Sequence, residues 1–468
     1  MLRSFRVSNH KSFRDEAELL LIPAYDKSRD VVPVAGILGA NASGKSNLLD
    51  ALRWLQKAVR ESYAHWEPGA GVPRTPFRLD PDYSSQPSLY CVEIVVDGSR
   101  YTYGLEVDDQ RVLTEWLYTY PHNRRRVIFE REDGTVRLGS TVPEYRARTE
   151  QLARQTRDNA LFLSVAAHNE LTEAQPLYNW FRQNLRFADG TTIAEDELVA
   201  RLTDADKRGS ILSLVRIADL GITNITIESR DSELAAIEKH ITDQSMLIAR
   251  LLAEMKGLQA DGTLSDTDSE DTEENHALAR RLVHAKLDRA REALASRHML
   301  EGSKEQIRSV PRLRFHHGAN TVPLTLTEQS SGTRSWLGLL SAALGALASG
   351  GMLIVDELNA SLHPHLSARL MTLFRDPETN PSGAQLLFTT HDATLLDEDT
   401  LGRDEIWFIE KDPDSGATNL FPLTDFHPRK NENRVGRYLA GAYGAIPLVS
   451  DYDLQQAFHD GGEADAAA

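Results

Sequence analysis

Residues 39–46 read Gly39-Ala40-Asn41-Ala42-Ser43-Gly44-Lys45-Ser46, which matches the pattern G-x-x-x-x-G-K-[ST]. An apolar run at 31–38 precedes them and predicts a buried strand, and the helix-favouring residues 47–52 follow. In such a loop, backbone N–H groups and the lysine surround phosphate oxygens, and the serine hydroxyl binds Mg²⁺. We therefore expect the chain to bind ATP or a similar triphosphate with Mg²⁺, and we name residues 39–46 the phosphate loop.

The predicted nucleotide-binding residues come from this loop and its flank. They are Gly39, Asn41, Ala42, Ser43, Gly44, Lys45, Ser46 and Asn47. Lys45 is also a predicted catalytic residue because it reaches the phosphate oxygens, and Ser46 is a predicted Mg²⁺ ligand. A glycine turn without function is the alternative interpretation of the same pattern.

The composition limits the class of protein. With 468 residues and 41% hydrophobic content, the chain can bury one large core or two ordinary ones. Its single cysteine, Cys91, excludes a disulfide framework within one chain and fits a reducing cytoplasm. No apolar stretch is long enough to cross a bilayer, so we expect a cytoplasmic protein with no membrane partner. A net charge of −17 restricts any contact with DNA to a local basic patch.

Strand and helix patterns divide the chain into five predicted segments. Residues 1–170 hold the phosphate loop and short β-branched and aromatic runs. Turns such as Asp97-Gly98 and Asp133-Gly134 separate these runs, and together they predict an antiparallel meander. Residues 171–230 are mostly helical in pattern, with one strand-like stretch at 222–227, and residues 231–305 form a separate insertion. Residues 306–450 return to alternating strands and helices, which predicts a mainly parallel sheet, and residues 451–468 form a tail.

The insertion at 231–305 has the spacing of a coiled coil. Residues with alternating spacings of three and four are Leu234, Ile237, Ile241, Gln244, Ile248, Leu251, Met255 and Leu258, and a weaker series is Val283, Leu287, Ala290 and Leu294. The stretch 265–274 between the two series is acidic and polar. We expect a short antiparallel helical hairpin with a solvated acidic tip; two amphipathic helices packed on the body are the alternative.

Two strand-like runs downstream end in residues with catalytic potential. The run 352–355 ends in Asp356 and Glu357, which we expect to hold Mg²⁺ through its water shell and to activate the attacking water, respectively. The run 385–390 leads to His391 at a carboxyl end, where open α/β sheets bind ligands. His391 would contact the γ-phosphate, so the predicted catalytic set is Glu357, His391 and Lys45. Solvated charges at a strand end and a structural histidine are the alternatives.

Small residues precede the helix-favouring stretch 336–347. The sequence Ser330-Ser331-Gly332-Thr333-Arg334 offers backbone N–H groups and hydroxyls at a predicted helix start. Such a surface suits phosphate oxygens. A simple serine helix cap is the alternative interpretation.

The order of these motifs resembles the ABC-type ATPase heads of the SMC and RecF group. The shared order is phosphate loop, insertion, residues 330–334, the strand with Asp356 and Glu357, residues 361–364 and the strand with His391. The resemblance implies an α/β fold, an ABC-type P-loop ATPase head with a mixed sheet and an antiparallel β lobe, interrupted by the inserted hairpin. It also implies a signature that closes over ATP bound to a second copy, formed by Ser330, Ser331, Gly332 and Thr333, of which Ser331 and Gly332 match the usual residues.

The first turn of the chain resembles the same heads. Asn9-His10-Lys11-Ser12-Phe13 looks like their Asn-Phe-Lys-Ser-Phe opening, with His10 in place of the aromatic residue. This implies that Lys11 binds the nucleotide. Residues 359–363 would form the loop that crosses the interface between two heads.

More closely, the chain is similar to the AAA ATPases of the abortive-infection type, the RloA and AbiL-like proteins of bacterial phage defence. The similar stretches are 76–79, 331–334, 356–359, 362–364, 429–433 and 438–447. The resemblance implies an enzyme that hydrolyses ATP with Mg²⁺ and forms an ATP-dependent dimer or higher homo-oligomer. It further implies a sensor or switch that controls a separate effector or nuclease protein.

A DNA-repair or recombination ATPase of the RecF or SMC type is the alternative function. The candidate DNA contacts are Arg124, Arg125, Arg126, Arg308, Arg312, Arg314 and His316. These residues would equally fit solvated turns or pairs with the acidic surplus. The inserted coiled coil disfavours a third possibility, the ATPase subunit of a transporter.

Overall fold

The computed structural model describes residues 1–140, 146–188, 195–218, 220–228, 231–260, 270–309, 312–318, 322–359, 362–430 and 432–446. The chain forms two compact units. Unit 1 comprises Met1–Ile193 and Arg334–Ala468, and unit 2 comprises Ala194–Thr333. The predicted tail at 451–468 lies outside the described residues.

A six-stranded sheet forms the centre of unit 1. Its strands, in spatial order, are β15 (Thr418–Pro422), β14 (Ile406–Lys411), β3 (Val34–Leu38), β13 (Gln385–Thr390), β12 (Met352–Val355) and β9 (Leu185–Ala188). All neighbours pair in parallel except β14 and β15, which are antiparallel. Every residue of β3, β12 and β13 is buried, as expected for strands covered on both faces. The mainly parallel sheet predicted from the sequence is therefore present, and β9 is an edge strand that we did not predict.

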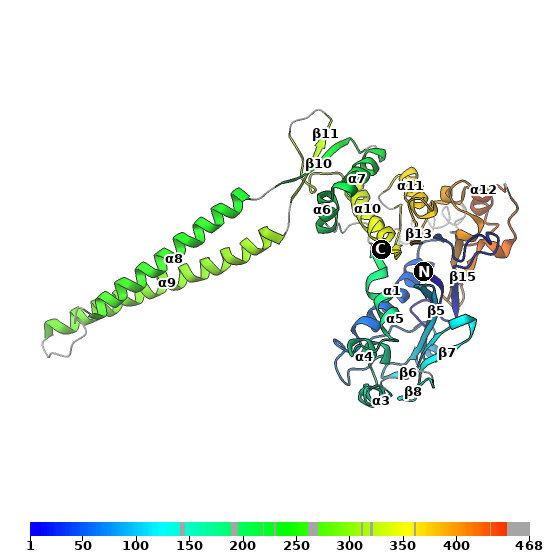
Figure 1. The fold of residues 1–468 in the computed structure, drawn as a ribbon, viewed down its shortest axis with the longest axis horizontal. Helices are drawn as coiled ribbons and strands as arrows, with labels where there is room; N and C mark the ends of the chain where they lie inside the picture. The colour runs from blue at the N-terminus through cyan, green and yellow to red at the C-terminus, as the bar shows by residue number, and fades with distance from the viewer. Residues whose placement is uncertain are drawn as a thin grey trace, which may run out of the picture. The chain divides into compact units, whose positions relative to one another are not determined.

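A seven-stranded antiparallel sheet forms the second layer of unit 1 (Figure 1). Its strands, in spatial order, are β2 (Ala17–Leu20), β1 (Leu2–Ser8), β4 (Ser88–Val96), β5 (Ser99–Val107), β6 (Val112–Thr119), β7 (Arg126–Glu132) and β8 (Thr135–Leu138). The turns Asp97-Gly98 and Asp133-Gly134 have positive φ at both residues, as two-residue hairpin turns require. The predicted antiparallel meander is confirmed.

The helices of unit 1 pack between and around these sheets. They are α1 (Lys45–Glu61), α2 (Pro81–Ser84), α3 (Arg146–Gln155), α4 (Phe162–His168), α5 (Gln175–Asn179), α10 (Ser331–Ser349, whose first turn crosses the unit boundary), α11 (Pro364–Arg375) and α12 (Arg434–Leu439). Helix α1 contributes Leu48, Leu52 and Leu55 to a core that also holds residues of both sheets. Short helical turns occur at Pro121–Asn123, Trp180–Asn184, Ala393–Leu396, Arg403–Glu405 and Leu423–Phe426.

Unit 2 combines short helices, a strand pair and two long helices. Its elements are α6 (Glu195–Thr203), α7 (Ala205–Ile217), β10 (Ile222–Glu228), α8 (Asp231–Ala260), α9 (Glu270–Ser309) and β11 (Arg312–His317). Strands β10 and β11 pair antiparallel, which confirms the strand predicted at 222–227. Helices α8 and α9 lie side by side (Figure 1), and Lys286 Nζ of α9 is 2.9 Å from Glu254 Oε2 of α8.

The seam predicted for these two helices agrees with the structure only in part. Leu251 and Ala290 are buried, whereas Leu294 is 45% exposed and its neighbour Ala293 is buried instead. Part of the predicted acidic tip, 270–274, belongs to α9, and 261–269 lies outside the described residues. The coiled-coil assignment itself stays a prediction. Of the helices in the described ranges, none has both the length and the apolar character needed to span a bilayer.

A buried carboxylate joins the meander to α4. Glu115 of β6 is fully buried and accepts hydrogen bonds from the Phe162 and Leu163 N–H groups, at 2.7 and 2.9 Å, and from the Tyr103 hydroxyl at 2.9 Å. Arg131 on β7 has a guanidinium nitrogen 3.8 Å from the same carboxylate. Burial raises the pKa of Glu115, and the Arg131 charge and these hydrogen bonds act against that rise. Glu115 therefore supplies the acceptor that the first turn of α4 lacks within the helix.

Replacing Glu115 with alanine should destabilise unit 1. The substitution leaves two backbone N–H groups buried without their acceptor and removes the carboxylate that balances the buried Arg131 charge, which together cost about 3–5 kcal/mol. Urea denaturation followed by tryptophan fluorescence measures the change, and exposed Glu132 on β7 gives the matched control, expected within about 0.5 kcal/mol of wild type. Equal midpoints for the two variants would contradict the role given to Glu115.

Candidate nucleotide-binding site

Three loops meet at the carboxyl edge of the six-stranded sheet. Strand β13 pairs in parallel with β3 on one side and with β12 on the other, so the three strands end at the same edge. The phosphate loop follows β3, Asp356 and Glu357 follow β12, and His391 follows β13. Segments separated by more than three hundred residues in the sequence therefore converge, as predicted from the strand pattern.

The phosphate loop passes too close to its neighbours for side chains at its two glycines. A Cβ atom at Gly39 would lie 2.2 Å from the Ile409 carbonyl oxygen, and one at Gly44 would lie 2.4 Å from Thr418 Oγ1. Gly44 also has φ +112°, which glycine adopts at little cost, and it caps the amino end of α1. The glycines are thus required by packing and by backbone conformation, and α1 points its free N–H groups toward the loop.

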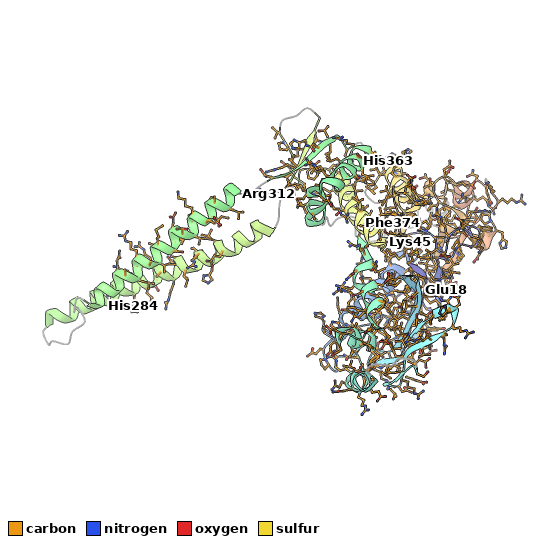
Figure 2. The ribbon with its side chains drawn as sticks, in the orientation of Figure 1. Glu18, Lys45, His284, Arg312, His363 and Phe374 are labelled. Carbon is orange, nitrogen blue, oxygen red and sulfur yellow. The ribbon has the colours of Figure 1, made fainter. Side chains whose placement is uncertain are left out.

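Lys45 is held inside the loop. Its side chain is only 5% exposed (Figure 2 labels it), and its Nζ donates to the carbonyl oxygens of Gly39 and Ala40, both at 2.8 Å. Burial lowers the pKa of the ammonium group to about 8, while the carboxylates of Glu357 and Asp356 act in the opposite direction. The ammonium group is therefore poised for an anionic ligand that would restore its ordinary pKa.

A cavity of about 270 Å³ lies over this loop. Its lining residues are Asn41, Ala42, Ser43, Gly44, Lys45, Ser46, Asn47, Glu357 and His391. Each of them was predicted from the sequence to bind nucleotide, to bind metal or to act in catalysis. Of the other predicted residues, Gly39, Asp356 and Lys11 do not line the cavity; Gly39 starts the loop, and Asp356 directly precedes Glu357 in the sequence.

Thr389, in β13, organises the two carboxylates. Its hydroxyl donates to Asp356 Oδ1 at 2.6 Å and accepts from the Glu357 N–H at 2.7 Å. Its carbonyl oxygen accepts from the Leu358 N–H at 3.0 Å. Glu357 has φ +53°, the left-handed conformation that is uncommon for a residue with a side chain. The backbone turn at Glu357 carries its carboxylate to the cavity, while Asp356 stays beside β13.

His391 lies between Lys45 and Glu357. Its Nδ1 is 3.4 Å from Lys45 Nζ, and its Nε2 is 3.5 Å from Glu357 Oε1. The ring can accept from the ammonium group and donate toward the carboxylate at the same time only in the neutral tautomer with hydrogen on Nε2. The three predicted catalytic side chains therefore form one continuous row along the cavity.

The residues present fit a bound triphosphate with Mg²⁺. Ser43 Oγ, within the loop, is buried and has no hydrogen-bond partner among the described residues, so it is a hydroxyl available to a ligand. Ser46 is exposed at the start of α1 and lines the cavity, and with Asp356 it offers the oxygen ligands that Mg²⁺ prefers. A Mg²⁺ ion held there would neutralise charge on the phosphate oxygens.

The predicted signature residues form the start of α10. Ser330 is its cap, since the Ser330 hydroxyl accepts from the Thr333 N–H at 3.1 Å and lies 2.8 Å from the Thr333 hydroxyl. Ser331 is exposed, whereas Thr333 is buried. The cap that the sequence left as an alternative is therefore present. Capping is compatible with a further role for Ser331 and Gly332, which stays a prediction.

Lys11 contacts an acidic residue of α1. Its Nζ is 2.6 Å from Asp50 Oδ2, and His10 Nε2 lies 3.0 Å from the same oxygen. Hydrogen bonds from His10 and Lys11 lower the pKa of Asp50 to about 2. The proposed contact between Lys11 and nucleotide stays a prediction.

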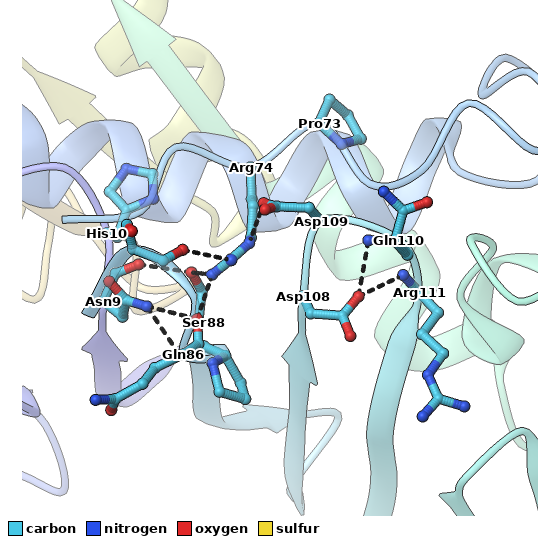
Figure 3. Close-up of polar contacts among 12 residues, drawn as sticks. Asn9, His10, Pro73, Arg74, Gln86, Ser88, Asp108, Asp109, Gln110 and Arg111 are labelled. Carbon is cyan, nitrogen blue, oxygen red and sulfur yellow. Dashed lines mark hydrogen bonds and ion pairs between the residues drawn. The ribbon is translucent and has the colours of Figure 1, made fainter. Parts of the chain in front are cut away.

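The turn that carries Lys11 is fixed from behind (Figure 3). Asn9 Nδ2 donates to the carbonyls of Tyr83 and Gln86 at 2.8 and 2.7 Å. Arg74 is bound to Asp109 Oδ1 at 2.7 Å and to the Gln86 carbonyl at 2.6 Å. These hydrogen bonds hold the turn in place beside α1.

Several candidate DNA-binding residues face acidic partners. Arg314 is 2.6 Å from Glu228, and Arg125 is 3.9 Å from Glu130 while its guanidinium stacks over Tyr118. His316 Nε2 lies 2.9 Å from the Thr226 hydroxyl. Arg308 lies in α9, where its side chain is outside the described residues. These contacts fit the structural interpretation of the basic residues.

Sequence reasoning missed two threonines that shape the site. Thr389 lies in the run 385–390, where two adjacent hydroxyls at a strand end are a signal for partners of the carboxylates. Thr418 had no recognisable signal in the sequence, because its partner in the phosphate loop, Ser43, lies 375 positions earlier.

The strand order and the phosphate loop together define a P-loop nucleotide-binding domain. A family model described as "AAA domain, putative AbiEii toxin, Type IV TA system" matches residues 34–397, more than three quarters of the chain. The chain belongs to this family of AAA-type P-loop domains. A search of curated proteins finds no match.

ATP affinity should fall as pH rises through about 8. Lys45 has a pKa of about 8, below its ordinary value, so its charge is fully present below that pH and is lost above it. A bound phosphate favours the charged form, and binding above pH 8 should therefore take up a proton. Calorimetric titration of ATP in buffers of different ionisation enthalpy measures this uptake.

Lys45→Arg is the matched variant, because arginine stays protonated throughout this range. The variant should show no proton uptake at this site. Uptake of equal size in both proteins would mean that another group titrates.

Proposed function

We propose that this protein is an ATPase that uses Mg²⁺ and works as a nucleotide-dependent switch. The observation that carries the proposal is the convergence of Lys45, His391 and Glu357 on the cavity of the phosphate loop. A carboxylate beside a histidine at this edge can accept a proton from an attacking water, which is what hydrolysis requires. Membership of the AAA-type family supports the same assignment.

Each residue has a defined task in this proposal. The loop N–H groups and Lys45 bind the phosphate oxygens, and Ser46 with Asp356 holds Mg²⁺. Glu357 accepts a proton from the attacking water, and His391 contacts the terminal phosphate. Glu357 suits a base because its side chain is 53% exposed at the cavity and can reach solvent.

The switch operates through association of two copies. The amino end of α10, with exposed Ser331, offers a hydroxyl and free N–H groups that can close over ATP on a second copy. ATP then stabilises the dimer because ATP binds the closed state better than the open one. Hydrolysis of ATP allows the two copies to separate. The resemblance to SMC and RecF heads supports this arrangement.

The biological role that we propose is bacterial defence against phage by abortive infection, in the RloA and AbiL-like branch. The chain would sense infection and control a separate effector, and the family description supports a toxin–antitoxin context. Cells that carry the complete locus should resist phage, and Lys45→Ala should abolish resistance in plaque assays. Full protection by Lys45→Ala would refute a nucleotide-dependent role in defence.

Two substitutions separate binding from hydrolysis. Glu357→Gln should keep ATP binding and lower turnover about 10²- to 10⁴-fold, because the proton acceptor is lost. Its ATP-bound dimer should accumulate in mass photometry. Lys45→Ala should prevent both ATP binding and dimer formation, because the buried charge that faces the phosphates is removed.

Controls address the base and the dimer separately. Glu378→Gln changes an exposed carboxylate away from the cavity and should leave turnover unchanged. Ser331→Arg should block the dimer while a single copy still binds ATP. Wild-type turnover in Glu357→Gln would remove Glu357 as the base, and stimulation of turnover by duplex DNA would favour the repair function.

A further inference from the structure

A chain of side-chain hydrogen bonds runs from α1 to the backbone of the phosphate loop. Asn47 Nδ2 donates to Ser12 Oγ at 2.7 Å, and Ser12 Oγ lies 2.7 Å from Thr418 Oγ1. Thr418 Oγ1 lies 2.8 Å from the Ser43 carbonyl oxygen. Four residues from three distant parts of the sequence thus form one continuous chain, and it ends within the phosphate loop.

The hydrogen count fixes the direction of this chain. A carbonyl oxygen only accepts, so the single hydroxyl hydrogen of Thr418 goes to Ser43. The bond between the two hydroxyls must then use the hydrogen of Ser12, which donates to Thr418. Ser12 in turn accepts from Asn47, an amide donor. Every member is satisfied in this direction, and chains of this kind strengthen each bond.

This series of hydrogen bonds orients one peptide group of the phosphate loop. A trans peptide places its carbonyl and its N–H on opposite sides, and the described residues contain no cis peptide. Because the Ser43 carbonyl points to Thr418, the N–H of the same peptide, which belongs to Gly44, points away from Thr418. Gly44 lines the cavity, so this N–H is directed to the side where a phosphate oxygen would accept it.

The two hydroxyls are themselves held firmly. Thr418 is 4% exposed, and its N–H donates to the Ser12 carbonyl at 2.8 Å. Thr418 begins β15 directly after a turn in which Asp412 Oδ1 accepts from the Ser415 N–H at 2.7 Å. Ser12 belongs to the turn at 9–13, in which Asn9 Nδ2 donates to the Tyr83 carbonyl and the Lys11 N–H donates to the Thr75 carbonyl at 2.8 Å. Neither hydroxyl can leave this series of hydrogen bonds unless a packed segment of the protein moves.

We propose that Thr418 and Ser12 are positioning residues for nucleotide binding, which act by fixing the Ser43–Gly44 peptide in its phosphate-binding orientation. Neither residue lines the cavity, so their effect passes through the loop. The inference rests on the proposed function, namely that ATP binds at the phosphate loop. It adds a contribution from β15 and the first turn of the chain, neither of which belongs to the phosphate-loop motif.

The test compares two substitutions of the same residue. Thr418→Val keeps the shape and removes the hydroxyl, and Thr418→Ser keeps the hydroxyl. Titration calorimetry with ATP should show roughly 5- to 20-fold weaker binding for Thr418→Val, because one hydrogen bond to a buried carbonyl is lost. Thr418→Ser should bind as wild type. Thr372→Val, whose hydroxyl bonds only within α11, is the control for a threonine change away from the site.

Ser12→Ala provides an independent test should Thr418→Val fail to fold. It interrupts the chain in the middle and should also weaken ATP binding. The double variant should lose less than the sum of the two single losses, because both substitutions act on one chain.

These experiments distinguish failure of the inference from failure of the proposed function. Wild-type protein that binds no ATP would refute the function and this inference together. Wild-type protein that binds ATP while Thr418→Val, or in its place Ser12→Ala, binds equally well would overturn the inference alone. Equal weakening in Thr418→Ser and Thr418→Val would also overturn it, because packing rather than the hydroxyl would then be responsible.

Discussion

The whole site depends on the parallel pairing of β13 between β3 and β12. In this register Thr390 lies opposite Leu38, and Val355 lies opposite Phe388, so three loops leave the sheet at one edge. Side chains alternate between the faces of a strand, and a slip of one residue would turn the Thr389 hydroxyl to the other face. Its bonds to both carboxylate segments would then be lost. The complete burial of the three strands makes such a slip costly, because their apolar side chains would have to repack on both faces.

Much of this arrangement could be predicted from the sequence because its signals are local. The phosphate loop needs eight adjacent residues, and the three strands are short, mainly apolar runs followed by the phosphate loop, by Asp356 and by His391. Once parallel pairing is assumed, geometry places those ends together. The turns Asp97-Gly98 and Asp133-Gly134 predicted the meander for a similar reason, since two adjacent residues determine each hairpin.

The contacts that complete the site could not be predicted because they join distant segments. Thr418 lies 406 positions from Ser12, and no spacing rule relates a strand start to a turn so far away. Glu115 reads as an ordinary polar residue of a meander strand, yet it is fully buried and caps α4. Strand β9 has four residues, one of them arginine, and becomes a strand only through pairing with β12. In each case tertiary contact decides the outcome, not local preference.

The structure positions its two principal charged groups by different physical means. Lys45 is placed by burial, since the loop encloses its stem and two loop carbonyls accept from its ammonium group. Glu357 is placed by its backbone, since a left-handed conformation turns the side chain to the cavity and the Thr389 hydroxyl holds its N–H. Such a conformation costs of order 1–3 kcal/mol for a residue other than glycine, and the pairing of β12 with β13 offsets it. A change of side chain at residue 357 therefore alters chemistry while the backbone that aims it persists, whereas a change at residue 45 alters charge and packing together.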